Sequence, residues 1–239
     1  MSATSSVVTD GRFAALFRVA GFAALLTALL IPLQIVAFIV WPPPAGNVIE
    51  WFDLFQRAPF IGLVSFDLAI LLEEALLIPI IAALYLLLRR RSESLMLIAA
   101  GLWLVSVALF IGSNTGFEML ALANRYDEAA TGTQQAMYVA AGQAMLTAYM
   151  EQGSSFVVGY SLASVAGILV GVAILRSRAL PHLAGWSAIV ANVLGFALFL
   201  PGIGVLLSII SVVILIVWYA LVGWRLVRLH GLKEEEADA

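Results

Sequence analysis

The chain has 239 residues, of which 63% are hydrophobic and only 11% are charged. Soluble domains carry about 25% charged residues, so this composition excludes an ordinary soluble protein. The net charge of −3, without a basic patch away from the predicted membrane flanks, excludes a nucleic-acid partner. The absence of cysteine excludes disulfides and thiolate metal sites. With two histidines, a histidine-rich metal or haem site is not expected.

Six apolar segments have about the length, roughly 20 residues, that a helix needs to cross a bilayer. We therefore predict an all-α, polytopic membrane helix bundle. One transmembrane domain would cover residues 13–230, between a short polar tail at 1–12 and an acidic tail at 231–239. The predicted spans are residues 19–41, 59–88, 95–123 (with 95–115 at lipid depth), 155–175, 183–200 and 204–224.

The basic residues are distributed unevenly between the two sides of the predicted bundle. Basic residues favour the cytoplasmic side of a membrane, so the distribution predicts that both termini are cytoplasmic in the cell inner (plasma) membrane. With that orientation, Arg57 and Arg125 are the only two of the 12 that face outside. The cytoplasmic ones are Arg12, Arg18, Arg89, Arg90, Arg91, Arg176, Arg178, Arg225, Arg228 and Lys233.

Two further helices are predicted in the outer segments. Residues 47–57 follow the turn PPPAG and begin with Asn47 and Glu50 in the spacing of a capping box. Their apolar side chains fall on one face, which predicts an amphipathic helix lying on the outer leaflet. Residues 133–152 form the second helix, with a polar stripe at Gln143, Thr147 and Glu151. We interpret it as a surface or re-entrant helix, because a seventh span would place the C-terminal basic residues outside.

Carboxylates occur within the predicted spans. Asp67, Glu73 and Glu74 lie in the second span, and Asn114 and Glu118 lie in the third. The rise of 1.5 Å per residue places all of them in the outer half of the bilayer. Each ionised acid near mid-bilayer costs roughly 2.5–3.5 kcal/mol on the insertion scale. The spans contain no Lys or Arg, so relief must come from water, a proton or an added cation.

Helix geometry sorts these acids. Asp67 and Glu74 are seven residues apart and are expected on one face of the second span, whereas Glu73 points about 100° away from Glu74. Asn114 and Glu118 are four apart and share a face of the third span.

We expect an outward-facing acidic pocket that binds or transports a cation or a small cationic ligand. Its oxygen ligands suit Ca²⁺, Mn²⁺ or Na⁺, or an organic cation, and no other cofactor is expected. Two alternatives stay open: acids that are merely wetted and hydrogen-bonded to neighbouring helices, and a proton relay. The candidate residues are Asp67, Glu73, Glu74, Asn114, Glu118 and Glu151.

Small residues recur every four positions in the fourth span, at Gly159, Ala163, Gly167 and Gly171. Such a stripe lets helices approach closely, and packing within the bundle is favoured over homo-oligomerisation.

A non-catalytic structural or accessory membrane subunit is the alternative function. An intramembrane enzyme is the least favoured class, because the spans lack the cysteine and histidine that would hold a catalytic metal.

The segment LRSRALPHLAGW, residues 175–186, resembles the turn between the fourth and fifth spans of a bacterial family of six-span membrane proteins that is known as a domain of unknown function. The second and third spans also resemble that family, with an acid at Glu73 or Glu74 and an amide at Asn114. The resemblance implies a six-span fold and a bacterial origin, and it implies no activity. The matching turn is Arg-Ser-x-x-Leu-Pro-x-x-x-Gly, at Arg176, Ser177, Leu180, Pro181 and Gly185.

Overall fold

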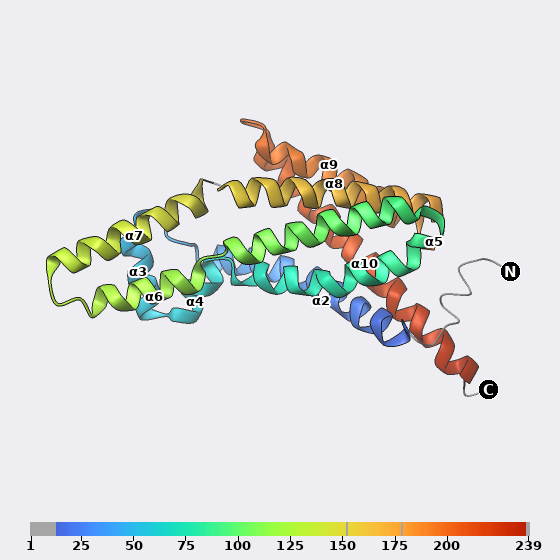
Figure 1. Ribbon diagram of the computed structural model, residues 1–239, viewed down its shortest axis with the longest axis horizontal. Helices are drawn as coiled ribbons and strands as arrows, with labels where there is room; N and C mark the ends of the chain where they lie inside the picture. Colours follow the sequence, from blue (N-terminus) through green and yellow to red (C-terminus); the bar gives the residue numbers. More distant parts are fainter. Residues whose placement is uncertain (1–12, 152, 178, 238–239) are drawn as a thin grey trace. The chain divides into compact units, whose positions relative to one another are not determined.

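The structure, a computed structural model, describes residues 13–151, 153–177 and 179–237. The predicted N-terminal tail at 1–12, Gln152, Arg178, residues 238–239 and the side chains of 230–237 lie outside the described part. Every regular element in the described part is a helix, as predicted. In chain order these elements are α2 (Ala14–Val40), α3 (Val48–Arg57), α4 (Pro59–Ser65), α5 (Leu68–Ser113), α6 (Gly116–Asp127), α7 (Gly132–Met150), α8 (Ser154–Ser177), α9 (His182–Gly195), the 3₁₀ helix η2 (Phe196–Phe199) and α10 (Gly204–Ala237) (Figure 1).

Several helical segments are long and apolar enough to cross a membrane. Five such segments occur in the described part, and the longest, Leu68–Asp127, has 60 residues, far more than one crossing needs. The predicted all-helical class, with several apolar helices of membrane-spanning length, is therefore confirmed. The other four are Ala14–Val40, Gly132–Ser177, His182–Phe199 and Gly204–Leu229.

Helix α5 contains a reversal of the chain. Ser92 has φ −151° and ψ 50°, outside the helical region, and it divides α5 into two helical arms that double back (Figure 1). The reversal follows Arg89–Arg91, where the sequence places the boundary between its second and third apolar segments. Separate helices on the two sides of these arginines are therefore confirmed.

The continuous helix predicted over residues 59–88 is wrong, and so is the one predicted over 95–123. Helix α4 ends at Ser65 and α5 begins at Leu68, while α5 ends at Ser113 and α6 begins at Gly116. The two interruptions are linked, because the Asn114 side chain donates hydrogen bonds to the backbone carbonyls of the first interruption. Helical periodicity does not register such a contact between distant residues.

The helices divide into two compact units, and we describe each separately. Unit 1 comprises residues 13–31, 73–108, 158–177 and 179–237, and an apolar core joins α2, both arms of α5, α8, α9 and α10. Helices α2 and α10 cross where Gly21 faces Gly223, and a Cβ atom added to Gly223 would lie 2.9 Å from the carbonyl oxygen of Gly21. Glycine at both positions therefore permits this backbone contact.

The small residues of the fourth predicted span lie on α8 within unit 1. Gly159, Gly167 and Gly171 are buried, and a Cβ atom on Gly171 would lie 2.7 Å from the carbonyl oxygen of Gly185 on α9. The Gly159 carbonyl accepts a hydrogen bond of 2.8 Å from the Ser106 hydroxyl of α5. These glycines thus pack within the unit, as favoured from the sequence, while homo-oligomerisation through the stripe stays a prediction.

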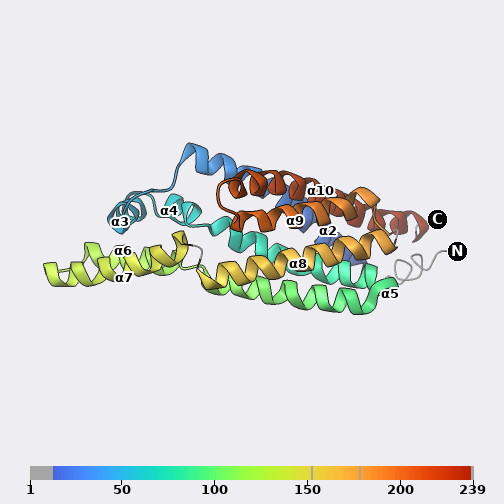
Figure 2. The same cartoon turned by 90° about the horizontal axis from the view of Figure 1, so that it is seen from above.

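Unit 2 comprises residues 32–72, 109–151 and 153–157, and its core lies between α3, α4, α6 and α7. Helices α6 and α7 form an antiparallel hairpin, which is visible in both views (Figures 1 and 2). Gly142 of α7 packs against Val48 and Phe52 of α3. The core of unit 2 consists of Val48, Trp51, Phe52, Phe55, Phe66, Met119, Ala123 and Leu146.

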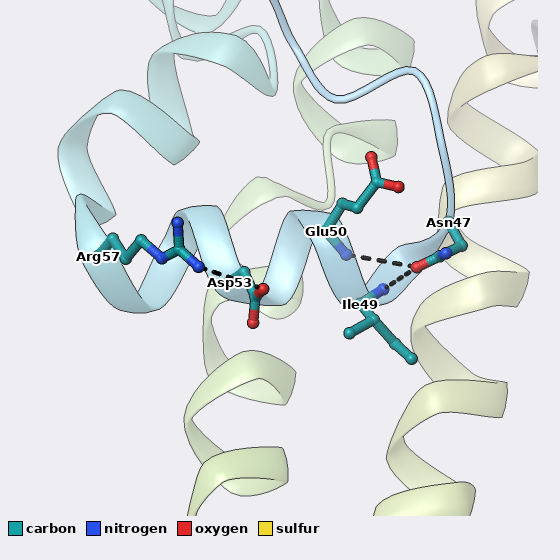
Figure 3. Close-up of polar contacts among 5 residues, drawn as sticks. All are labelled: Asn47, Ile49, Glu50, Asp53 and Arg57. Carbon is teal, nitrogen blue, oxygen red and sulfur yellow. Dashed lines mark hydrogen bonds and ion pairs between the residues drawn. The ribbon is translucent and has the colours of Figure 1, made fainter.

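Helix α3 has the predicted faces in a different environment. The Asn47 side chain caps it by accepting hydrogen bonds from the amides of Ile49 and Glu50, and Arg57 pairs with Asp53 on the polar side (Figure 3). Its apolar face, however, is at most 1% exposed, because α4, α6 and α7 cover it. The prediction that this face lies in the outer leaflet is therefore wrong.

Candidate functional site

Unit 2 contains a pocket with a volume of about 680 Å³. Its walls come from the beginning and end of α5, the last turns of α7 and the first turn of α8. About half of the lining side chains are apolar, the others carry a polar atom, and Asp67 is the one carboxylate among them. The lining residues are Asp67, Ile70, Phe110, Ser113, Asn114, Thr115, Ala144, Met145, Ala148, Tyr149, Met150, Gly153, Ser154, Ser155 and Phe156.

Asp67 occupies the break between α4 and α5. Its φ of 62° is left-handed, and among the described residues it alone has a positive φ without being glycine. Aspartate tolerates this region better than most side chains. The Asn114 Nδ2 atom donates to the carbonyl oxygens of Phe66, at 3.3 Å, and of Asp67, at 3.4 Å. The Asn114 Oδ1 atom accepts from the Gly116 amide at 3.1 Å, so this one side chain secures both helix breaks.

The Asp67 carboxylate joins three parts of unit 2. The Tyr149 hydroxyl, from α7, donates to Oδ2 at 2.8 Å. The Gln34 Nε2 atom, from the C-terminal part of α2, donates to Oδ1 at 3.2 Å. Each carboxylate oxygen has a second lone pair, so each retains capacity for another donor.

The environment of Asp67 shifts its protonation equilibrium toward the neutral acid. Asp67 precedes the apolar helix that begins at Leu68. Burial raises the pKa of the Asp67 carboxyl above its ordinary value of 3.8, and the hydrogen bonds from Tyr149 and Gln34 oppose that rise. Neither arginine of unit 2 lines the pocket: Arg57 pairs with Asp53 at 3.6 Å, and Arg125 is exposed.

Aromatic rings fix the position of the Tyr149 side chain. Phe66 stacks on the Tyr149 ring with centroids 4.3 Å apart. Trp51 meets both rings edge-on, at 5.1 Å from Phe66 and 6.3 Å from Tyr149. Such packing leaves the Tyr149 ring little rotational freedom. The core of unit 2 therefore holds the hydroxyl toward Asp67.

The structure brings together only part of the predicted acidic site. Asp67 and Asn114 line the pocket, but both polar atoms of the Asn114 side chain form hydrogen bonds with backbone groups. Glu118, on α6, and Glu151, after α7, are exposed and are not among the lining residues. The predicted common helix face of Asp67 and Glu74 is wrong, because Asp67 is not helical.

Glu73 and Glu74 belong to unit 1. Glu74 has a buried Oε2 atom without a hydrogen-bond partner among the described residues. Tyr219 of α10 is buried and interacts electrostatically with both glutamates. These two acids thus have an environment of their own within unit 1, and neither lines the pocket of unit 2.

Sequence reasoning did not include Tyr149 or Gln34 in the site. A signal existed for Gln34, the one amide side chain within the first predicted span. Tyr149 carried no such signal, because it lies outside the polar stripe assigned to its helix. Its role depends on Phe66 and Trp51, which are more than 80 residues away in the chain.

Among the described residues, no three or more histidine, cysteine, aspartate or glutamate side chains are arranged to hold a metal ion.

Comparisons with known proteins add no assignment. No protein-family model, no curated protein and no solved structure matches the chain. The resemblance to the bacterial six-span family therefore stays a prediction.

Proposed function

We propose that this protein is an integral membrane protein that binds a small cation in an outward-facing pocket at Asp67. The observation that carries the proposal is a carboxylate lining a cavity of about 680 Å³ whose other lining residues include no basic side chain. A cavity of this size is typical of small-molecule sites. A bound cation would compensate the ionised carboxylate, which burial otherwise disfavours.

The proposed orientation is supported by the charge distribution. With six spans and cytoplasmic termini, the Ser92 reversal and Arg89–Arg91 would lie inside. This orientation agrees with the preference of basic residues for the cytoplasmic side. The connections at 41–67 and 114–154, which supply much of unit 2, then face outside. In this arrangement a ligand would reach Asp67 from outside the cell.

The alternative is a structural or accessory subunit, and one observation favours it. Both oxygens of Asp67 already accept a hydrogen bond, from Tyr149 and from Gln34. A carboxylate whose only role is to hold neighbouring helices together would accept hydrogen bonds in the same way. The two functions differ in whether a cation changes the stability of the folded protein.

Thermal unfolding of the purified protein in detergent, with Na⁺, Ca²⁺, Mn²⁺ or alkylammonium salts, tests the proposal. A cation that binds the folded state stabilises it by about 2.7 kcal/mol at a concentration of 100 Kd. We expect at least one cation to raise the midpoint in the wild type and to lose this effect in Asp67→Asn. Asp53→Asn, the same change on the exposed face of α3, should behave as the wild type. The absence of any Asp67-dependent shift would contradict the proposal and favour the accessory role.

A further inference from the structure

We infer that the ligand of the Asp67 pocket is a protonated organic amine with an apolar body, rather than a metal ion. The inference rests on the proposed function, which it deepens by naming the class of cation. It is carried by the number of carboxylates in the pocket, by the remaining hydrogen-bonding capacity of Asp67 and by the chemistry of the other walls.

The pocket offers few carboxylate ligands to a metal ion. Ca²⁺ takes 6–8 oxygen ligands, commonly from several carboxylates. Asp67 is the only carboxylate in the lining, and each of its oxygens already has a protein donor. The Asn114 amide oxygen already accepts from the Gly116 amide, so it too has only one lone pair left. One shared carboxylate matches a single positive charge and disfavours a divalent metal ion. Between Na⁺ and an organic ammonium ion, the apolar and aromatic walls favour the ammonium ion.

The Asp67 carboxylate keeps one open acceptor position on each oxygen. Tyr149 and Gln34 occupy one lone pair on each oxygen of Asp67, so one acceptor position remains on each. An N–H group of an ammonium ion can donate to such a position and form a charge-assisted hydrogen bond. A quaternary ammonium ion has no N–H group and cannot make that bond. The open positions therefore favour a protonated amine.

Apart from Asp67, Asn114 and four serine or threonine hydroxyls, the pocket wall is apolar or aromatic. Phe110 and Phe156 meet edge to face with centroids 5.7 Å apart, and both line the cavity with Tyr149. Met145 and Met150 add thioethers, which adapt to ligands of irregular shape. Walls of this kind stabilise an alkyl or aryl group, and aromatic faces attract a cation. The cavity is also far larger than one water, which occupies about 30 Å³ in the liquid.

Equilibrium binding of phenethylammonium chloride to the purified full-length protein, measured by calorimetry in detergent, tests this class of ligand. Matched probes are 2-phenylethanol, which is neutral and has nearly the same shape, and CaCl₂ and NaCl. We expect phenethylammonium to bind more tightly than 2-phenylethanol, and Asp67→Asn to weaken its binding about tenfold or more, as loss of a charge-assisted hydrogen bond predicts.

Two further variants keep the test independent of any folding defect in Asp67→Asn. Ala148→Phe places a ring in the pocket and keeps the Asp67 carboxylate in the chain, and it should abolish binding. Asp53→Asn changes an exposed aspartate and should leave binding as in the wild type.

The outcomes separate the two proposals. Asp67-dependent binding of Ca²⁺ or Na⁺ without binding of phenethylammonium would overturn the ligand class and leave the cation pocket standing. Equal binding of the amine and the alcohol, unchanged in Asp67→Asn, would show partition into an apolar space and would overturn the ligand class. No Asp67-dependent binding of any probe would overturn both proposals.

Discussion

Asp67 combines a left-handed backbone with a partly buried carboxylate that receives hydrogen bonds from two distant side chains. A residue in this region of φ and ψ costs about 1–3 kcal/mol when it is not glycine, although aspartate tolerates it better than most. Such residues persist where the surrounding structure determines them, and they are concentrated at functional sites. At this residue Asn114 determines the backbone, and Tyr149 and Gln34 orient the carboxylate.

The raised pKa of Asp67 predicts how the stability of the folded protein depends on pH. Because burial raises its folded-state pKa above 3.8, the folded state binds this proton more tightly than the unfolded state. Stability from Asp67 therefore falls as pH rises from about 3.8 through the raised pKa, and it is regained on acidification. The unfolding midpoint of the wild type, minus that of Asp67→Asn, should increase as pH falls through this window. A difference that is constant with pH, or that decreases on acidification, would contradict this account.

Asn114 gives a second prediction at this scale. Asn114→Asp keeps an acceptor for the Gly116 amide but loses the donor to the carbonyls of Phe66 and Asp67. We expect a loss of about 1–3 kcal/mol in the free energy of unfolding, since two partly buried carbonyls lose their partner. Asn124→Asp is the matched control, because exposed Asn124 only accepts a bond from Gln56. Denaturant unfolding in mixed micelles measures both, and equal stability of the two variants would refute this role of Asn114.

At the scale of elements, helix packing in unit 1 depends on small residues at crossings. Gly21 on α2 and Gly223 on α10 face each other so closely that a Cβ atom on Gly21 would lie 2.9 Å from the backbone nitrogen of Val227. Backbone atoms of a packed helix cannot move aside as the end of a long side chain can. This crossing therefore requires glycine.

Gly21→Ala should lower the free energy of unfolding by about 1–3 kcal/mol, the usual cost of overpacking. Gly101→Ala on the second arm of α5 is the control, since a Cβ atom there meets nothing within 4 Å. In the control the helix preference of alanine should leave stability unchanged or raise it by up to about 1 kcal/mol. Thermal unfolding of the two variants measures this difference in stability. If Gly21→Ala were as stable as Gly101→Ala, the crossing of α2 and α10 would not require glycine at position 21.

The same elements show what the sequence can predict. Apolar runs and the Arg89–Arg91 cluster are local signals, and they located the helices and the reversal at Ser92. The break at Asp67 depends on Asn114, 47 residues away, and so gives no local signal. For α3 the amphipathic pattern identified the buried face and could not distinguish a cover of lipid from a cover of α6 and α7. Asp67 and Asn114 were found because polar groups among apolar residues are conspicuous; Tyr149 was missed because its role arises from packing.

At the scale of the whole molecule, we propose a membrane-spanning helical protein with an outward-facing cation site. The excess of basic residues at the predicted cytoplasmic ends supports the proposed orientation. The pocket lies within unit 2, whose residues come largely from the two connections predicted outside. Outward access to Asp67 and recognition of a positive charge are therefore the two parts of the central claim.

Labelling of a single cysteine at Ser113 tests both parts most directly, because the natural chain has no cysteine and Ser113 lines the pocket. In intact cells, Ser113→Cys should react with a membrane-impermeant maleimide, and Glu93→Cys, beside the Ser92 reversal, should react only after permeabilisation. Phenethylammonium, but not 2-phenylethanol, should slow the reaction at Ser113→Cys and should lose this effect when Asp67→Asn is added. Labelling of Ser113→Cys only in permeabilised cells, or at a rate that no cation changes, would contradict the account.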